Sequence, residues 1–510
     1  MKVYLLWVLI LILPGLIFST DVSGSVSGEW TLDNSPYNVT GDLNISTENT
    51  LTIEAGVQVL FQGNYLFFVN GRIIAQGTED NPVVFNAQGI NPTWRGFVFL
   101  NSNDEISVQN SLFRHCEFEN AFAYKEGTEP AYYEYGSVIR AINSSKIRIQ
   151  NCTFSHNTAS WSGGAVYLEN SDLNFSDCIF LENTSSFAGS GIMCESSNII
   201  LERCTFKNNQ AVAFGALSLW DESSAQVTNS YFLSNRANAC GGIYVTSSDI
   251  ELIGCVLARN VSTYGSGGAI GASLDNIVKL SNCTLYGNTS PMMGGGIWAN
   301  SQTQLMITNT IFWNNSESIS LNDNSLANVS YSLIPEGFEG ENILTCEPAF
   351  ADTSSFEFLI QDVSPCVDAG TPNVLELNLP LLDIHGNNRI QDGDQDGTAL
   401  VDIGASEYNV IVSQDDATQI KPQILSVYPN PFNPTTTISF SLDKSAYAEI
   451  KIFNLKGQLI SDYSDFYENG NHHIVWQGTD QNHKRVSSGI YFVKLKNSSD
   501  TNVKKVIMLK

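Results

Sequence analysis

The sequence predicts an all-β protein in which short parallel strands stack as successive coils, followed by a small β-sandwich. Two observations support this prediction. One phrase recurs in the middle of the chain, with clear copies at 147–157, 199–209 and 278–288. The segments before and after it alternate apolar and polar residues and show no helical period. A fixed period of 25–28 residues indicates stacked supersecondary units.

The composition excludes one class of partner. The chain has 52 Asp and Glu residues against 25 Lys and Arg, for a formal net charge of −27. Nucleic-acid binding requires a basic surface that neutralises phosphates, so we expect no nucleic-acid partner. A chain this acidic is typical of a protein whose surface is exposed to a saline medium, or of a surface that binds divalent cations.

Residues 1–20 have the pattern of a secretory signal peptide. Lys2 precedes an apolar run that Pro14 and Gly15 interrupt. The run is short for a bilayer and contains a helix breaker. No other segment approaches about 20 consecutive apolar residues, so we expect no transmembrane segment in the mature chain.

Residues 21–120 are expected to form an N-terminal cap and the first coils. Segments 51–61 and 82–86 have the apolar pattern of β-strands. Gly residues and an Asn-Pro pair, which are typical of turns, lie between them. Together with Trp30 and the Trp-Arg-Gly of 94–96, these segments resemble the opening coils of exported bacterial parallel β-helix proteins.

Residues 121–345 repeat the coil with fixed columns. An apolar column, expected to stack in the core, consists of Phe154, Phe180, Phe206, Phe232, Leu257, Leu285 and Phe312. A second strand in each coil is predicted to point inward through Val166, Ile192, Leu217, Ile243, Ile270 and Ile297. The phrase and its period resemble the right-handed parallel β-helix of the pectate-lyase-like type.

One polar column is invariant across seven coils. It consists of Asn157, Asn183, Asn209, Asn235, Asn260, Asn288 and Asn315. An amide repeated at one bend can bond to the amides of the coils above and below. We therefore predict an inward-facing ladder rather than a ligand track.

The ten cysteines fall mostly in another column of the repeat. That column reads Cys116, Cys152, Cys178, Cys204, Ser230, Cys255, Cys283 and Thr310. Because Ser and Thr share it, we interpret it as small core residues. A bridge between neighbouring coils stays open, since stacked strands lie about 4.8 Å apart. Cys346 and Cys366 lie outside the column and are the better candidates for a disulfide.

Residues 346–410 change character. They contain Ser-Pro-Cys-x-Asp-Ala-Gly at 364–370, Asp-x-x-Gly-x-x-Arg at 383–389 and Asp-Ile-Gly-Ala-x-Glu at 402–407. These motifs, in this order, resemble the choice-of-anchor Q module. That module follows bacterial β-helices and precedes a sorting signal.

A polar linker, 411–423, leads to a last domain at 424–510. Short alternating strands at this spacing predict a small, Ig-like β-sandwich. Pro-Asn-Pro-Phe-Asn-Pro at 429–434, Ser-Ser-Gly-Ile-Tyr at 487–491 and the basic end resemble the type A C-terminal sorting domain of the type IX secretion system. The resemblance implies handling by that machinery, secretion and attachment to the outer cell surface.

An acidic loop is the candidate metal site. Asp392, Asp394 and Asp396 alternate before Gly397, as in the first half of an EF-hand-type Ca²⁺ loop. The bidentate Glu of such loops is missing, and Asp402 is the candidate to replace it. The alternative is a solvated acidic turn.

The outward side of the second strand run is the candidate binding face. Tyr167, Tyr244 and Trp298 are expected to point outward, with Trp220 nearby, and to stack on sugar rings. Small residues beside them would form a shallow trough: Ala165, Gly191, Ala216, Gly242, Ala269 and Gly296. Glu169 and Glu195 on adjacent coils are weak candidates for a glycosidase pair.

We therefore expect an exported, cell-surface β-helix protein with a binding, adhesion or structural role, with an extracellular polysaccharide as the expected partner, rather than an enzyme. The alternative is a polysaccharide lyase or glycoside hydrolase. A lyase of this fold needs a Ca²⁺-binding acidic cluster beside an Arg or Lys base, but Arg203, Arg236 and Arg259 are scattered. A passive surface spacer is the third possibility.

Overall fold

The computed structural model forms two compact units, Met1–Val410 and Ile411–Lys510. It describes residues 19–88, 93–100, 110–145, 147–374, 377–409, 426–428, 430, 432–442, 446–454, 458–467, 470–481, 484–496 and 501–509. The predicted signal peptide lies almost entirely outside these residues. Among them, no helix is long and apolar enough to cross a membrane.

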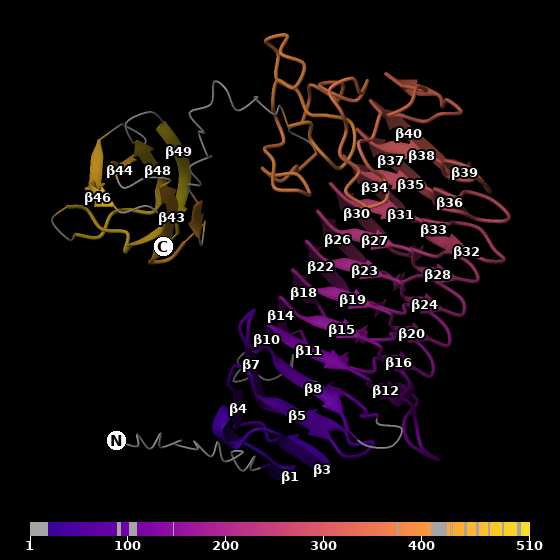
Figure 1. Cartoon of the computed structure of the whole chain (residues 1–510), viewed down its shortest axis with the longest axis vertical. Coiled ribbons are helices and arrows are strands. Elements are labelled where there is room, and N and C mark those ends of the chain that lie inside the picture. The colour runs from indigo at the N-terminus through magenta and orange to yellow at the C-terminus, as the bar shows by residue number, and fades with distance from the viewer. Residues whose placement is uncertain are drawn as a thin grey trace, which may run out of the picture. The chain divides into compact units, whose positions relative to one another are not determined.

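The first unit is a β-helix whose strands pair in parallel with the next coil (Figure 1). One face forms a 13-stranded sheet. Its strands are β2 (Gly28–Trp30), β4 (Thr50–Ile53), β7 (Arg72–Gln76), β10 (Ser111–Arg114), β14 (Ile147–Gln150), β18 (Leu173–Ser176), β22 (Asn198–Glu202), β26 (Ser224–Thr228), β30 (Asp249–Ile253), β34 (Ile277–Ser281), β37 (Gln304–Thr308), β40 (Leu326–Ser330) and β41 (Gly340–Glu341).

The second face follows the first after a turn in each coil. It consists of β5 (Gln58–Phe61), β8 (Val83–Ala87), β11 (Cys116–Glu119), β15 (Thr153–Ser155), β19 (Ile179–Leu181), β23 (Thr205–Lys207), β27 (Tyr231–Leu233), β31 (Val256–Ala258), β35 (Thr284–Tyr286) and β38 (Ile311–Trp313). Six coils add a two-residue strand behind it: β12 (Phe122–Ala123), β16 (Thr158–Ala159), β20 (Thr184–Ser185), β24 (Gln210–Ala211), β28 (Arg236–Ala237) and β32 (Val261–Ser262).

The third face carries the second strand run of the repeat. It consists of β6 (Phe67–Val69), β9 (Phe97–Leu100), β13 (Ile139–Ile142), β17 (Val166–Glu169), β21 (Ile192–Glu195), β25 (Leu217–Trp220), β29 (Ile243–Thr246), β33 (Ile270–Ser273), β36 (Ile297–Asn300) and β39 (Ile319–Leu321). At the N-terminal end, β3 (Tyr37–Ile45) pairs with β5, β6 and β1 (Thr20–Ser25). Two 3-10 turns, Leu32–Asn34 and Ala131–Glu134, lie in loops.

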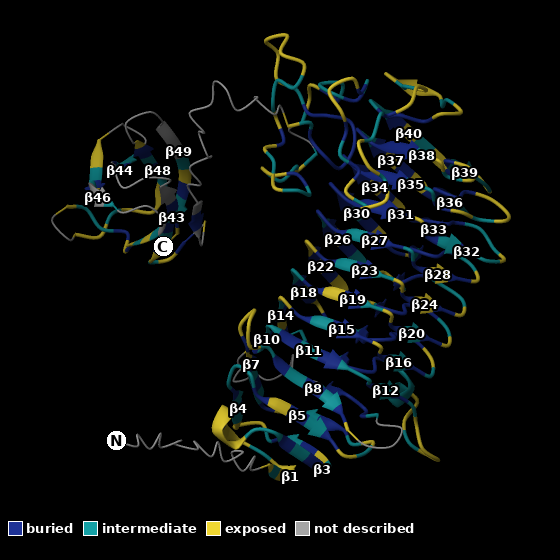
Figure 2. Ribbon diagram, in the orientation of Figure 1, coloured by how far each residue is buried: buried dark blue, intermediate teal, exposed yellow. Residues whose placement is uncertain are grey.

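The apolar columns fill the interior as predicted. Figure 2 shows buried residues along the strands and exposed residues mainly at the turns. The rings of Phe154, Phe180, Phe206 and Phe232 stack on one another with centroids 4.5–4.8 Å apart. The inward residues of the third face are equally buried. This continuous core supplies most of the driving force for stacking the coils, because hydrophobic stabilisation scales with the apolar area removed from water.

The predicted Asn ladder is confirmed. Each Nδ2 donates to the Oδ1 of the next Asn at 2.9–3.0 Å, from Asn157 through to Asn315. The same Oδ1 also accepts the backbone N–H of the preceding Asn, as Asn209 does from Asn183. Each amide thus satisfies several buried polar groups at once, which explains why no other residue occupies the column.

A second polar ladder was not anticipated. At the corner between the third and first faces, each Ser Oγ accepts the backbone N–H of the Ser one coil earlier. The rungs are Ser144, Ser171, Ser197, Ser223 and Ser248. Short Ser-rich turns are common in loops, so this column carries no distinctive sequence signal.

The cysteine column is buried in the core, as predicted, and burial raises the pKa of the Cys152, Cys178 and Cys204 thiols well above the ordinary value. All ten cysteines are free thiols. Cys346 and Cys366, the better candidates for a disulfide, are therefore not bridged: Cys366 is buried, whereas Cys346 is exposed.

Residues 346–374 and 377–409 form turns and isolated bridges, and they pack against the outer side of the second face. Phe358 and Ala405 join Val256 and Ala258 in one apolar cluster, and a second cluster surrounds Ile311. Backbone contacts fix the docking, such as Ala405 N–H to Thr284 Oγ1 at 3.0 Å. In Figure 1 this stretch (orange) lies beside the last coils.

The C-terminal unit is a sandwich of two antiparallel sheets, as predicted. One contains β42 (Ser426–Tyr428), β43 (Thr436–Leu442) and β47 (Gly470–Trp476). The other contains β44 (Ala446–Asn454), β45 (Leu459–Asp462), β46 (Asp465–Tyr467), β48 (Gly489–Lys496) and β49 (Thr501–Met508). Ile438 and Trp476 from the first sheet share one core with Ile450 and Val493 from the second.

Candidate functional site

The expected exposed column on the third face is mostly covered. Tyr167 is only 3% exposed and Met193 is 1% exposed, so the prediction that Tyr167 lies open to solvent is wrong. The loop before each strand folds back over the outside of the face. A Cβ added to Gly163 would lie 3.0 Å from the Tyr167 Cβ, so only glycine allows this approach.

The predicted trough of small residues is also wrong. Ala165, Ala216 and Ala269 lie in the main core. A Cβ on Gly191 would lie 2.8 Å from the Phe206 ring, so this column faces the interior stack. The chain bends just before each strand of the third face, and strict alternation across a strand does not extend through a bend.

The covering loops form an outer ridge of their own. Phe187 N–H donates to the Trp161 carbonyl at 2.8 Å, and Ala213 N–H donates to the Phe187 carbonyl at 2.8 Å. The Trp161 ring is 45% exposed and stacks on Phe187 with centroids 5.0 Å apart. Neither residue was predicted from the sequence, although each lies four positions after a ladder Asn.

Trp220 and Tyr244 join this ridge. Phe187 contacts Trp220 edge-on at 5.6 Å, and Phe214 stacks on Tyr244 at 4.1 Å. Trp220 and Tyr244 lie 6.3 Å apart, so the structure brings these two predicted residues together. We call Trp161, Phe187, Phe214, Trp220 and Tyr244 the aromatic patch.

Trp298 lies apart from the aromatic patch. In the strand register, Gly271 separates it from Tyr244. It makes no ring contact among the residues that the structure describes. The predicted aromatic column is therefore interrupted between β29 and β36.

The two predicted carboxylates meet at the border of the patch. Glu169 and Glu195 are register partners on β17 and β21, and Trp220 continues their column on β25. The Tyr167 hydroxyl lies 2.9 Å from Glu195 Oε2 and 3.2 Å from Glu169 Oε2. One hydroxyl proton can be donated to only one of them at a time, so the two carboxylates share a single donor.

The closeness of the two carboxylates to one hydroxyl affects the pKa values of Glu195 and Tyr167. Burial raises the pKa of Glu195; the Tyr167 hydrogen bond opposes this shift, and the charges of Glu169 and Asp221 add to it. Burial, together with both Glu charges, also raises the pKa of Tyr167, which stays protonated as a donor.

The acidic loop has a partner that the sequence did not reveal. Oxygens of Asp368, Asp392 and Asp394 all lie within 4.8 Å of one another. Asp368 Oδ2 also accepts the backbone N–H groups of Gly393 and Asp394, at 2.7 and 2.9 Å. Asp396 is exposed and bonds locally to the Thr398 N–H at 2.7 Å.

Asp402 lies in a different place from the predicted loop ligands. It is buried, and its carboxylate accepts the backbone N–H groups of Asp368 and Tyr408. Burial raises its pKa to about 6, against the lowering effect of these two hydrogen bonds. Asp402 therefore supports the loop from behind and does not join the oxygens of Asp392 and Asp394.

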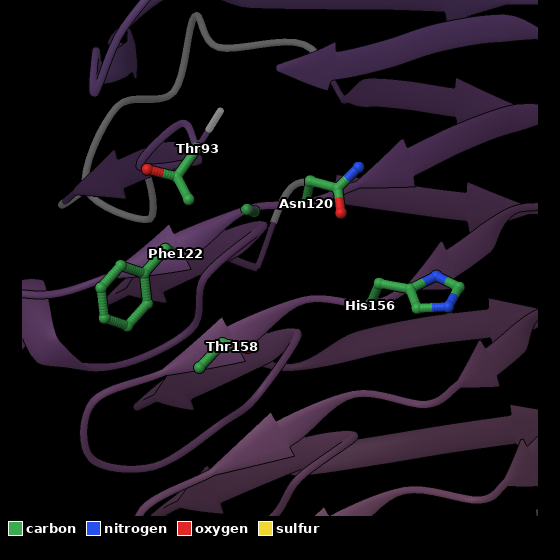
Figure 3. A pocket seen from close by; sticks show the side chains of 6 residues that line it. Thr93, Asn120, Phe122, His156 and Thr158 are labelled. Atoms are coloured by element: carbon green, nitrogen blue, oxygen red, sulfur yellow. The ribbon is translucent and has the colours of Figure 1, made fainter. Parts of the chain in front are cut away.

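A shallow pocket of about 300 Å³ lies at another corner of the β-helix (Figure 3). Its lining residues are Thr93, Asn120, Ala121, Phe122, His156 and Thr158. His156 is a turn residue with φ of 56° and a 3.0 Å contact to Glu182. The pocket brings together no acid–base pair.

These features define a class: a repeat β-helix with a side-packed irregular segment and a C-terminal sandwich. The family model described as "Right handed beta helix region" matches residues 84–260 and 215–340, together half of the chain. The chain therefore belongs to the right-handed β-helix family. A pectate-lyase-like β-helix model also matches residues 24–112.

A secretion system C-terminal sorting domain matches residues 426–509. This domain indicates handling by the type IX system, export and attachment to the cell surface. It coincides with the sandwich predicted from the sequence.

No curated protein matches the chain. Among solved structures, dimeric latent PorU from Porphyromonas gingivalis is 16% identical, with a TM-score of 0.16. PorZ from the same organism, described as an essential surface component of the type IX secretion system, is 22% identical, with a TM-score of 0.14. The matches cover 18% and 17% of this chain, and only 10% and 11% of those proteins.

Proposed function

We propose that this protein is a non-catalytic binding protein for an extracellular polysaccharide, displayed at the cell surface by its sorting domain. One observation carries the proposal: a partly exposed aromatic patch lies directly beside the half-buried carboxylates of Glu169 and Glu195. Aromatic faces stack on the apolar faces of sugar rings, and carboxylates accept hydrogen bonds from sugar hydroxyls.

A catalytic role is the second candidate, and the same carboxylate pair is its basis. A retaining glycosidase needs one carboxyl group with a raised pKa as acid beside an ionised one. Burial raises the pKa of Glu195, as the acid of such a pair requires. The Tyr167 hydroxyl already lies within hydrogen-bond distance of both carboxylates, and this favours binding over catalysis.

The test compares Trp161→Ala and Phe187→Ala with the wild-type protein in glycan binding by calorimetry, alongside an assay for reducing sugars and unsaturated uronates. We expect each variant to lose at least about tenfold in affinity, the equivalent of about 1.4 kcal/mol. Ile200→Ala is the matched control, because this exposed apolar residue lies on the first face. Product formation that disappears in Glu195→Gln would establish the catalytic alternative instead.

We also propose that Asp368, Asp392 and Asp394 hold a Ca²⁺ ion, which prefers carboxylate and carbonyl oxygens. The Oδ1 atom of Asp392 is buried and has no hydrogen-bond partner in the described part of the chain. A buried carboxylate oxygen without a donor is costly unless a cation or hydrogen bond compensates it. A bound Ca²⁺ would tie the 392–396 loop to Asp368 and stiffen this segment.

Calorimetry of the full chain with Ca²⁺ tests this site. We expect one binding event that Asp368→Asn and Asp392→Asn abolish and that the exposed control Asp362→Asn leaves unchanged. Wild-type protein without heat of binding at millimolar Ca²⁺ would refute the proposal.

Export is tested by removing the sorting domain. We expect a chain that lacks 424–510 to accumulate in the periplasm, whereas the full chain reaches the surface. Normal surface display of the truncated chain would contradict a role for the type IX machinery.

A further inference from the structure

The carboxylates beside the aromatic patch have no compensating cation. None of the ion pairs among the described residues involves Glu169 or Glu195. Their shared partner, the Tyr167 hydroxyl, offers one proton to two acceptors. Both carboxylates are half-buried, so water screens them less than it screens a surface acid.

Further negative charge surrounds this pair. Asp221 and Glu222 follow Trp220 and are exposed, and the charge of Asp221 acts on Glu195. Glu134, whose carbonyl accepts the Trp161 N–H, borders the other end of the ridge, but its carboxylate is paired with Lys125 at 3.4 Å and adds no net charge. With a net charge of −27 on the whole chain, a polymer of uronic acids would be repelled from this face.

The aromatic patch supplies the complementary half of a cation site. Trp220 lies next to Glu195 in the strand register, and Phe187 packs edge-on against it at 5.6 Å. An ammonium group beside an indole or phenyl face gains a cation–π attraction, which grows when the site is partly desolvated. Carboxylates and aromatic faces together suit a ligand that is both a sugar and a cation.

We propose that the preferred ligand is an amine-bearing polysaccharide, whose hexosamine residues carry free ammonium groups. One ammonium is held between the Glu169 and Glu195 carboxylates, and the sugar ring to which it belongs lies against Trp220 and Phe187. A neighbouring sugar lies over Trp161. This inference rests on the proposed function and specifies the chemistry of its ligand.

The geometry explains why an ammonium is suited to this position. It has three N–H donors, so it can bond to both carboxylates while Tyr167 continues to donate to one of them. Charge-assisted hydrogen bonds of this kind are about twice as strong as neutral ones. An N-acetylated sugar would keep the stacking contacts and lose both charge-assisted bonds.

The test measures binding of two probes to the full chain at a pH below the amine pKa. The probes are an oligomer of β-linked glucosamine and its fully N-acetylated form. We expect the amine oligomer to bind at least about tenfold more tightly. Glu169→Gln and Glu195→Gln should remove this preference, so that the amine oligomer binds no more tightly than the acetylated one, and circular dichroism with thermal unfolding should show that the variants are folded.

Other outcomes separate the two proposals. Equal affinity for both oligomers, with loss in Trp161→Ala, would overturn the amine inference and leave polysaccharide binding intact. No binding of either oligomer or of any neutral glycan would overturn both. Competition by Ca²⁺ that disappears in Glu195→Gln would show that a metal ion occupies the carboxylate pair, and this also contradicts the inference.

Discussion

The coils of the β-helix and the segment 346–409 solve the same problem in opposite ways. Both must satisfy polar groups away from water. The coils do so with neutral side chains repeated at one position, as the Asn ladder and the Ser ladder illustrate. Segment 346–409 does so with buried charged side chains that belong to no repeat.

The charged network of 346–409 is compact. Arg389 and Glu407 form an ion pair at 3.0 Å, with side chains only 3% and 1% exposed. Glu407 also accepts the Asp402 N–H at 3.0 Å, and its own N–H donates to Asp383 at 2.8 Å. The residues that carry the resemblance to the choice-of-anchor Q module therefore converge on one buried site.

The coils and the segment 346–409 should therefore differ in how much stability a single substitution costs. A ladder spreads its bonds over many equivalent coils, so the loss of one rung leaves the others in place. A single buried ion pair has no substitute, and removal of one partner leaves an uncompensated charge. The predictions below test this contrast.

The largest effect is expected for Arg389→Met. It leaves Glu407 buried without its cation and should destabilise 346–409 by about 3–5 kcal/mol. Hydrogen exchange should show lost protection in 346–409 and normal protection in the coils. Arg203→Met is the control, because its pair with Asp177 is solvent-exposed and should be worth less than about 1 kcal/mol. Equal losses of stability in Arg389→Met and Arg203→Met would contradict the expectation that the buried ion pair matters more than the exposed one.

A smaller loss is expected for Asn209→Ala. It leaves the Asn183 N–H and the Phe180 carbonyl without their partners, at a cost of about 3 kcal/mol. We expect hydrogen exchange to increase in the coils next to Asn209 and not at the ends of the β-helix. The neighbouring exposed Asn208, which has φ of 55°, provides the control Asn208→Gly. A global loss of structure would mean that the ladder acts as one unit.

Stability should depend on pH through Asp402. Its folded pKa of about 6 lies above the ordinary value of 3.8, so the folded chain holds more protons between these values. By linkage, its contribution to the free energy of unfolding falls by about 2–3 kcal/mol as pH rises from about 4 to above 6. Urea unfolding across this range should show the slope in the wild-type protein and a weaker slope in Asp402→Asn. If the free energy of unfolding depends on pH equally in the wild-type protein and in Asp402→Asn, groups other than Asp402 cause the dependence.

The smallest effect is expected in the cysteine column. Cys204→Ser should cost about 1 kcal/mol or less, because Ser230 already fills the next rung and donates to the Thr228 carbonyl at 2.9 Å. Thermal unfolding measures this. In the folded chain, only the exposed Cys346 should react with a thiol reagent, and rapid labelling of more than one thiol would contradict the buried column.

Some of the candidate site was predictable. Trp220 and Tyr244 were placed on the same face, and Glu169 and Glu195 on adjacent coils, because the repeat fixes which strand positions lie above one another. Trp161 and Phe187 were missed because they lie in loops, and loop residues follow no alternation. The burial of Tyr167 was missed for the same reason: the loop that covers it belongs to no predicted strand.

The sequence by itself determined the coil, its inward columns, the Asn ladder and the C-terminal sandwich. These follow from contacts between equivalent positions one period apart, which a single chain displays directly. Only the tertiary structure decided which surface is free and which carboxylates meet. Asp368 joins Asp392, and Asp402 turns away to a buried network, because 346–409 folds against earlier coils, where Asn282 bonds to Asp402 and Thr284 to Ala405 across 120 and 121 residues. Such contacts leave no period in the sequence.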